Sequence, residues 1–246
     1  MWSVWPEKLD VYVGAGLVLV QCPGAPLWRF EPPPTLPLAD VLQKVDEALG
    51  REHAKPWRLR VHLSAAFCPP VAFVAPASVR RHREMVALAQ AHAALAIGMP
   101  GEQAAEIVCS LDSRHRGLAA FMQPGIYQII QRWAQSCQGR LLGLQPLWAV
   151  ATRDRLSERS QVNRLAFLEP DALTVLELST RGAAGAMSWM RRFDAAEAVA
   201  HLAQLESRSE APEQWNTVIL TFARDPVEAV LSGGPSVLHR HWGRLP

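Results

Sequence analysis

Short apolar runs separated by turns predict strands in the first two thirds of the chain. The runs are rich in β-branched and aromatic residues, as strands in a packed sheet are. They lie at 11–13, 17–20, 28–30, 58–64, 71–74, 106–111, 117–122 and 141–147. Apolar residues spaced three and four apart predict helices at 38–49, 78–97 and 125–138, with Ser78 as the cap of the second. Strands interleaved with helices favour a mixed sheet covered by helices.

The last third of the chain repeats part of this pattern. Strands are expected at 164–170, 172–178, 183–190 and 217–223, with a helix at 194–205 capped by Asp194 and a short element at 227–231. The order of three strands, a helix and a strand therefore occurs twice. The polar segment 153–161 separates the two copies. We expect a first lobe at residues 1–155 and a second, smaller lobe at 156–246.

The first hairpin contains the most informative turn. Gly14-Ala15-Gly16 joins two apolar strands, and glycines there suit a tight turn with positive φ angles. The same residues could form a loop that cradles a phosphate. The choice between these interpretations decides whether the protein is expected to be an enzyme.

Composition excludes several classes of protein. The chain has 246 residues, of which 49% are hydrophobic, enough for a substantial core. Its net charge is only +2 and no long basic block stands out, so we expect no nucleic-acid partner. The four cysteines are scattered, without the paired spacing of a zinc site, and no metal is expected.

The sequence also argues against export and against a membrane span. The first ten residues carry charges and a proline where a signal peptide needs an apolar region. The longest apolar run, Val11 to Val20, is about half as long as a helix must be to cross a bilayer. We therefore expect a cytoplasmic protein.

The doubled order of elements resembles that of the actin-like superfamily, which includes actin, Hsp70 and sugar kinases. Within it, the chain is similar to the cytoplasmic domains of type IV pilus and type II secretion inner-membrane platforms. This resemblance implies a two-lobed α/β fold of the ribonuclease H-like kind, with mixed sheets whose first three strands are antiparallel. The second lobe is expected to be reduced, because the stretch from Asn163 to Pro246 leaves no room for the large insertion of the full-sized family.

The nucleotide motifs of that superfamily are incomplete here. Tyr12-Val13-Gly14 stands where active members have Asp-x-Gly, and Glu177-Leu178-Ser179 stands at the expected place of the second acid-x-glycine motif. Gly233 and Gly234 resemble the loop that contacts adenosine. A phenol is protonated at neutral pH and is a poor ligand for a hard cation, so Tyr12 does not replace the missing carboxylate.

The resemblance and the missing acid together predict no catalytic residues and no ATP hydrolysis. Gly14, Gly16, Gly233 and Gly234 are candidate vestigial nucleotide-binding residues. No cofactor is expected, although ATP binding without hydrolysis stays open.

The function expected from the resemblance is that of a non-catalytic scaffold. It would bind the cytoplasmic peptide of an inner-membrane pilus or secretion protein and lie at the inner membrane through that partner. Trp28 and Trp57, which flank the first helix, are candidate partner-binding residues. One alternative is a kinase or ATPase whose acid is Asp10 or Glu177. Another is an unrelated protein-interaction module.

Overall fold

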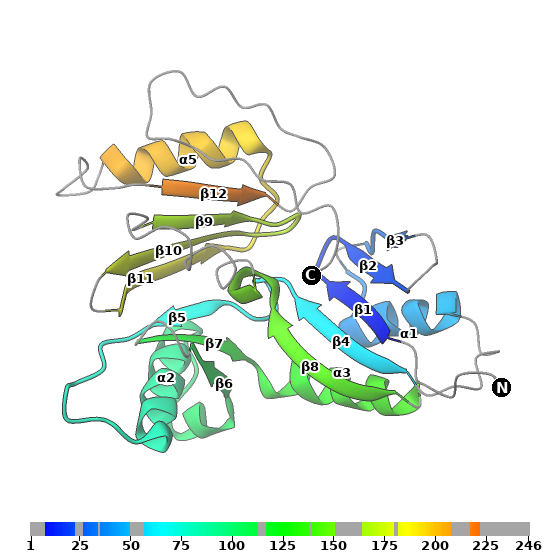
Figure 1. Ribbon diagram of the computed structural model, residues 1–246, viewed down its shortest axis with the longest axis horizontal. Coiled ribbons are helices and arrows are strands. Elements are labelled where there is room, and N and C mark those ends of the chain that lie inside the picture. The colour runs from blue at the N-terminus through cyan, green and yellow to red at the C-terminus, as the bar shows by residue number, and fades with distance from the viewer. Residues whose placement is uncertain are drawn as a thin grey trace.

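The computed structural model describes residues 8–22, 27–33, 35–49, 57–112, 117–137, 139–150, 164–179, 182–207 and 217–221. Within these ranges the strands form a five-stranded, a four-stranded and a three-stranded sheet. Figure 1 shows the four-stranded sheet lying between its helix, α5, and the rest of the molecule. None of the helices in the described part of the chain has the length and apolarity needed to span a bilayer.

The five-stranded sheet, in the order β3-β2-β1-β4-β8, is the frame of the first lobe. Its strands are β1 (Lys8–Val13), β2 (Val18–Gln21), β3 (Trp28–Phe30), β4 (Arg58–Leu63) and β8 (Arg140–Pro146). The first three are antiparallel neighbours, whereas β4 runs parallel to β1 and β8 parallel to β4. The helices are α1 (Leu38–Leu49) and α3 (Pro124–Ser136).

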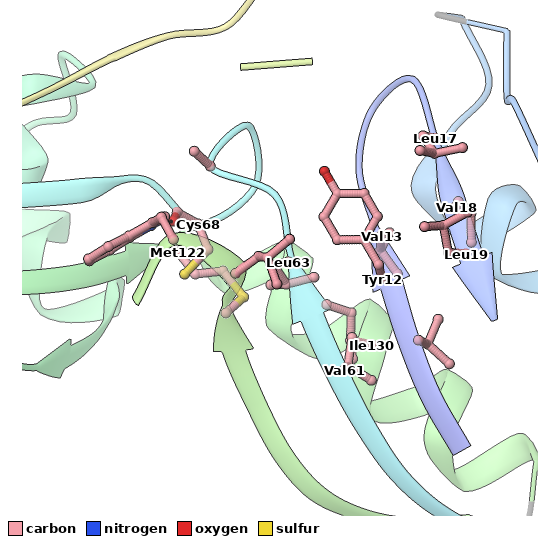
Figure 2. Close-up of a cluster of buried hydrophobic side chains, with 14 of the residues drawn as sticks. Tyr12, Val13, Leu17, Val18, Leu19, Val61, Leu63, Cys68, Met122 and Ile130 are labelled. Carbon is pink, nitrogen blue, oxygen red and sulfur yellow. Dashed lines mark hydrogen bonds between the residues drawn. The ribbon is translucent and has the colours of Figure 1, made fainter. Parts of the chain in front are cut away.

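The two faces of β1 have different surroundings because side chains alternate along a strand. Val11 is paired with Val61 of β4, and both lie in one core cluster with Ile130 of α3. Tyr12 lies on the opposite face, and Figure 2 shows its ring pointing away from Ile130. The helices thus cover one face of the sheet, and the Tyr12 hydroxyl is directed to the other.

A small subdomain is inserted between β4 and α3. It consists of β5 (Pro70–Ala72), α2 (His82–Ala96), the 3-10 helix η1 (Gly101–Glu106), β6 (Val108–Leu111) and β7 (Leu118–Met122). Its strands form a separate antiparallel sheet in the order β5-β7-β6, packed on α2 around its own apolar cluster. The sequence pattern predicted α2 and the three strands, but it predicted neither η1 nor that the strands form a sheet of their own.

The predicted start of α2 was wrong. The helix begins at His82 with Arg81 as its N-cap, rather than at Ser78. Residues 76–79 instead form a turn, in which the Val79 N–H donates to the Pro76 carbonyl oxygen at 3.0 Å. Arg81 keeps an extended backbone, with φ −78 and ψ 135, so the helix cannot extend back to Ser78.

The four-stranded sheet of the second lobe has the order β11-β10-β9-β12. Its elements are β9 (Arg164–Leu168), β10 (Leu173–Ser179), β11 (Gly182–Trp189), α5 (Ala195–Ser207) and β12 (Thr217–Thr221). Again the first three strands are antiparallel, as expected. The last strand, β12, runs parallel to the first, β9. The expected lobe boundary and the element at 227–231 fall in residues 151–163 and 222–246, outside the described residues, so both stay predictions.

The strands β9 and β10 of the second lobe are buried on both faces. Ala166 and Leu168 of β9 pack in one cluster with Leu202 of α5. Leu165 and Phe167, on the other face, belong to the core cluster of the first lobe. Strands that are buried on both sides consist mostly of apolar residues, and this accounts for the apolar content of the segments RLAFL and LTVLELS. The two lobes therefore share one apolar interface.

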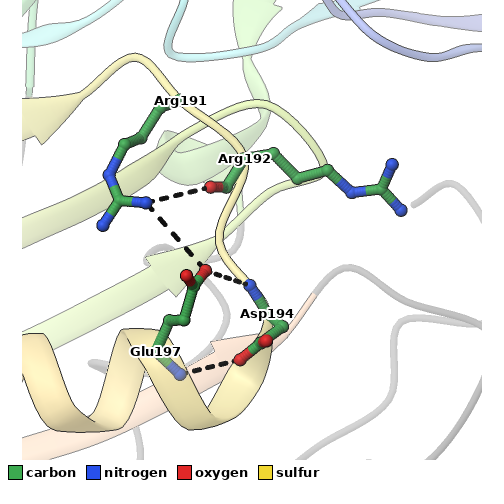
Figure 3. Close-up of polar contacts among 4 residues, drawn as sticks. All are labelled: Arg191, Arg192, Asp194 and Glu197. Carbon is green, nitrogen blue, oxygen red and sulfur yellow. Dashed lines mark hydrogen bonds and ion pairs between the residues drawn. The ribbon is translucent and has the colours of Figure 1, made fainter.

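Asp194 caps α5 as predicted from the sequence. Its Oδ1 accepts a hydrogen bond from the Glu197 N–H at 2.7 Å, and Glu197 Oε2 accepts one from the Asp194 N–H at 3.1 Å (Figure 3). This reciprocal arrangement is a capping box. Arg191 Nη1 lies 3.9 Å from the same Glu197 oxygen and donates to the Arg192 carbonyl oxygen.

We expect Asp194→Ala to lower the free energy of unfolding by about 1 kcal/mol, because the Glu197 N–H loses its acceptor. Urea denaturation followed by circular dichroism would measure the change. Asp194→Asn keeps an acceptor oxygen and should stay close to the parent protein. Equal losses in both variants would contradict the capping role.

Candidate functional site

The turns after the two central strands meet at the interface between the lobes. In the first lobe, β1 ends in the turn Gly14–Gly16, closed by a hydrogen bond from the Gly14 N–H to the Leu17 carbonyl oxygen at 2.9 Å. In the second lobe, β9 ends in the turn Glu169–Ala172, closed by the Glu169 N–H and the Ala172 carbonyl oxygen at 2.8 Å. The equivalent ends of the two repeats thus face each other.

Four side chains gather where these turns meet, and we call them the interlobe carboxylate cluster: Tyr12, Ser64, Glu169 and Asp171. All four are buried, and Asp171 is the most exposed of them at 8%. Ser64 Oγ donates to Asp171 Oδ1 at 2.6 Å. The Tyr12 hydroxyl is hydrogen-bonded to Glu169 Oε1 at 3.3 Å and lies 3.5 Å from Asp171 Oδ1. Both hydroxyls belong to the first lobe and both carboxyls to the second.

Two backbone N–H groups of the first lobe complete the contacts. The Ala15 N–H, in the middle of the first hairpin turn, donates to Asp171 Oδ2. The Ala65 N–H, just after β4, donates to Glu169 Oε2 at 3.0 Å. Backbone N–H groups in such turns are general binding sites for anionic oxygens, including those of phosphates. Here carboxylates of the same chain take those positions.

Ser64 is oriented by the end of β4. Its N–H donates to the Val13 carbonyl oxygen at 2.9 Å, which extends the parallel pairing of β1 and β4 by one residue. Its carbonyl oxygen accepts from the N–H groups of Phe67 and Cys68, and its Oγ accepts from the Ala66 N–H at 3.1 Å. The Oγ hydrogen is therefore free to point at Asp171.

Gly14 is required by the close approach of the second lobe. A Cβ atom at this position would lie 2.9 Å from Asp171 Oδ2 and 2.9 Å from the Tyr12 hydroxyl oxygen. The expectation of positive φ angles in this turn was wrong, because neither Gly14 nor Gly16 has one. A Cβ at Gly16 would come no nearer than 4.0 Å to Asp171, so of the two glycines in this turn only Gly14 lacks room for a side chain.

The cluster is rich in acidic groups. Burial, and then the charge of Asp171, raises the pKa of Glu169 well above its ordinary 4.5. Burial, and then the charges of Glu169 and Asp171, also raises the pKa of Tyr12, so its phenol stays protonated and acts as a donor. Within the described ranges, no group of three His, Cys, Asp or Glu side chains is placed to hold a metal ion.

The second acid-x-glycine motif was assigned to the wrong hairpin, at Glu177-Leu178-Ser179 in β10. Because β9 is the central strand that pairs with parallel β12, its end corresponds to the end of β1, and the matching turn begins at Glu169. Glu177 lies further along β10, opposite Arg164, and forms an ion pair with it at 3.0 Å. Asp10 lies 3.7 Å from Arg60. Neither of these two proposed acids is among the contacts of the cluster.

Sequence reasoning missed the two acids that do meet the first hairpin. It treated Glu169-Pro170-Asp171 only as a turn between strands. Two acids around a proline are a common turn composition, so the pattern alone carried little signal. Aligning the two repeats of strands would have shown that this turn is equivalent to the turn at Gly14. Gly233 and Gly234 lie outside the described residues, so their predicted role stays a prediction.

The two candidate partner-binding tryptophans have different environments. Trp28 is half-buried on β3, an edge strand of its sheet, and stacks on Phe30 with ring centroids 5.8 Å apart. Trp57 is buried in the core, and its carbonyl oxygen accepts the Arg140 N–H at 2.7 Å. Burial favours a packing role for Trp57, and only Trp28 offers part of its ring to a partner.

Solved structures of similar fold include three informative relatives. The first is a Bacteroides thetaiotaomicron protein with an actin-like ATPase fold and unknown function, with 8% identity and a TM-score of 0.56 over 88% of this chain and 82% of that one. The second is the cytoplasmic domain of EpsL, an inner-membrane component of the Vibrio cholerae type II secretion system, with 13% identity and a TM-score of 0.51 over 94% and 90%. The third, from the PilM–PilN type IV pilus biogenesis complex, has 14% identity and a TM-score of 0.59 over 88% and 81%.

At these identities the likeness shows the fold alone. The chain has an actin-like α/β fold with mixed sheets, as the resemblance implied. No protein-family model and no curated protein sequence matches it.

We expect Tyr12→Phe to lower the free energy of unfolding by about 1–2 kcal/mol, because a buried carboxyl oxygen loses its donor. Chemical denaturation would measure it. The matched control is Tyr127→Phe on α3, the only other tyrosine of the chain, which is half-buried and outside the cluster. It should change stability by less than about 0.5 kcal/mol. Equal effects of the two substitutions would contradict the contribution of the Tyr12 hydroxyl.

Proposed function

We propose that the protein is a non-catalytic actin-like scaffold that binds the cytoplasmic segment of an inner-membrane protein in a pilus-assembly or secretion complex. The observation that carries this proposal is the position of Asp171. Its carboxylate accepts the N–H of Ala15, at the centre of the hairpin turn where a phosphate-binding loop would need that group.

The chemistry of the cluster supports the non-catalytic part of the proposal. Phosphoryl transfer depends on positioned metal ions and charges that stabilise the transferred group. A polyphosphate entering this site would have to displace the Asp171 and Glu169 carboxyls from the Ala15 and Ala65 N–H groups. The first hairpin offers the protonated hydroxyl of Tyr12 in place of a metal-binding carboxylate.

The relatives support the partner class. One belongs to a complex of two pilus-biogenesis proteins, and another is the cytoplasmic domain of an inner-membrane secretion component. A shared fold does not by itself define function, since one fold can host many activities. We propose that this chain is cytoplasmic and lies at the inner membrane through its partner.

The edge of the first-lobe sheet is the surface that we propose for the partner peptide. β3 is an edge strand in the described part of the sheet and pairs with β2 through three residues. An extended peptide can add to such an edge through backbone hydrogen bonds, with side chains entering neighbouring pockets. Trp28 and Phe30 form a stacked, half-buried aromatic pair on this strand and would contact those side chains.

We expect the purified protein to release no phosphate from ATP above a protein-free blank in the presence of magnesium. A coupled phosphate-release assay would measure this. Turnover that disappears in Glu169→Gln, Asp171→Asn, Asp10→Asn or Glu177→Gln would show that a carboxylate is catalytic. That outcome would replace the scaffold proposal with the kinase or ATPase alternative.

We expect Trp28→Ala to weaken binding of the partner peptide by on the order of tenfold, as loss of a central aromatic contact does. Peptides from the cytoplasmic segments of candidate single-pass pilus and secretion proteins would be titrated by calorimetry. Trp28→Phe, which keeps an aromatic ring, should retain most of the affinity, and Gly233→Ala should retain all of it.

Two outcomes would count against different parts of the proposal. Binding that depends on Gly233 and ignores Trp28 would show that the sheet edge is the wrong surface. Failure of every candidate peptide to bind the parent protein would overturn the scaffold function and favour an unrelated interaction module.

A further inference from the structure

We propose that the interlobe carboxylate cluster is a proton-controlled latch between the lobes. In the closed state Glu169 carries a proton on Oε1 that faces the Tyr12 oxygen, while the Tyr12 hydrogen points at Asp171 Oδ1. The turn Glu169–Ala172 is then held against the first lobe, and loss of that proton to solvent releases the turn. This device goes beyond the proposed scaffold function and does not depend on it.

Every hydrogen bond of the cluster that joins a carboxyl to a donor crosses the interface. Each of the four carboxyl oxygens of Glu169 and Asp171 is hydrogen-bonded to one group of the first lobe, namely Tyr12, Ser64 or one of the two backbone N–H groups described above. Both carboxyls lie in one turn of the second lobe. Detachment of that turn would break these contacts together, because Glu169 and Asp171 are joined by a single proline.

In the described part of the chain, no positively charged group is among the contacts of the two carboxyls. The Tyr12 hydroxyl lies within 3.5 Å of both, which shows how close the two acids are. The Cys68 thiol, after β4, is near enough for Glu169 to raise its pKa, although burial is the larger cause. Each of these neighbours is neutral or acidic.

The nearest basic groups on β4 do not balance the acids either. His62 lies beside Tyr12 in the sheet, but burial, and then the charge of Arg60, lowers its pKa to about 4. His62 is therefore neutral at physiological pH. Arg60, two residues before it on the same face, is paired with Asp10.

The direction of the pH dependence follows from the raised pKa of Glu169. In the open state the carboxyl would titrate near its ordinary 4.5, whereas in the closed cluster it holds its proton to higher pH. The closed state thus binds more protons, so the stabilisation from this group is complete below 4.5 and is lost as pH rises through the raised pKa. Ionisation then places two negative charges side by side in a buried site, and the turn is repelled.

The Ala15 and Ala65 amides report the state of the latch directly, because each donates to one of the two carboxyls. Hydrogen exchange of these amides, corrected for intrinsic rates, would be followed by NMR between about pH 5 and pH 9. We expect their protection factors to fall about tenfold per pH unit within the titration window, as the release of one proton requires. The amide of Val61, in the central strand β4, should keep its protection.

Glu169→Gln is the decisive variant. A glutamine can still accept the Ala65 N–H through its oxygen, and its nitrogen can donate to the Tyr12 oxygen, but it has no proton to lose. Protection of Ala15 and Ala65 should therefore become independent of pH. Glu102→Gln, which removes an exposed carboxyl from η1, should keep the pH dependence of the parent protein.

Three results would overturn the latch. The first is protection of Ala15 and Ala65 that does not change with pH in the parent protein. The second is the same pH dependence in Glu169→Gln as in the parent. The third is loss of protection at Val61 in step with Ala15, which would mean global unfolding. Should Glu169→Gln fail to fold, Asp171→Asn replaces it. It should narrow the pH range over which the Ala65 amide loses protection and reduce the total loss, because removing the charge of Asp171 lowers the raised pKa of Glu169 toward its ordinary value.

Discussion

The contact between the carboxyls of one lobe and the N–H groups of the other sets the geometry of the whole interface. The Ala15 and Ala65 N–H groups donate to carboxyl oxygens of Asp171 and Glu169, as they would to the oxygens of a bound ligand. Around them, Leu165 and Phe167 continue the core of the first lobe into the second. The apolar surface brings the lobes together, and the polar contacts fix which turn faces which, since hydrogen bonds are directional and apolar contacts are not.

The inserted subdomain has a different relation to this interface. It has its own apolar cluster around α2, and β11 of the second lobe contacts its strand β5. The second lobe therefore rests on two supports, the turns of the central strands and the edge of a separate sheet. Figure 1 shows β11 between β10 and this subdomain.

Much of the fold followed from the sequence because local patterns encode it. The apolar runs at β9 and β10 and the Asp194 cap were read correctly since each depends on neighbours in the chain. The interlobe carboxylate cluster could not be predicted in this way, because its residues are far apart in the sequence. Ser64, Glu169 and Asp171 meet across more than 100 residues of sequence, as the separation of 107 between Ser64 and Asp171 shows. Ser78 was misread as a cap because a turn and a helix start favour the same residue type.

Gly14 shows how a residue of a sequence signature can have a structural cause that is independent of the activity it usually marks. In this protein a methyl group there would collide with Asp171 and Tyr12, whether or not any nucleotide binds. Purifying selection on this glycine would therefore continue after loss of the ligand. A comparison of homologues that took this glycine as evidence of ATP binding would therefore mistake a packing requirement between the lobes for a nucleotide site. The residue at position 12 would distinguish these two cases.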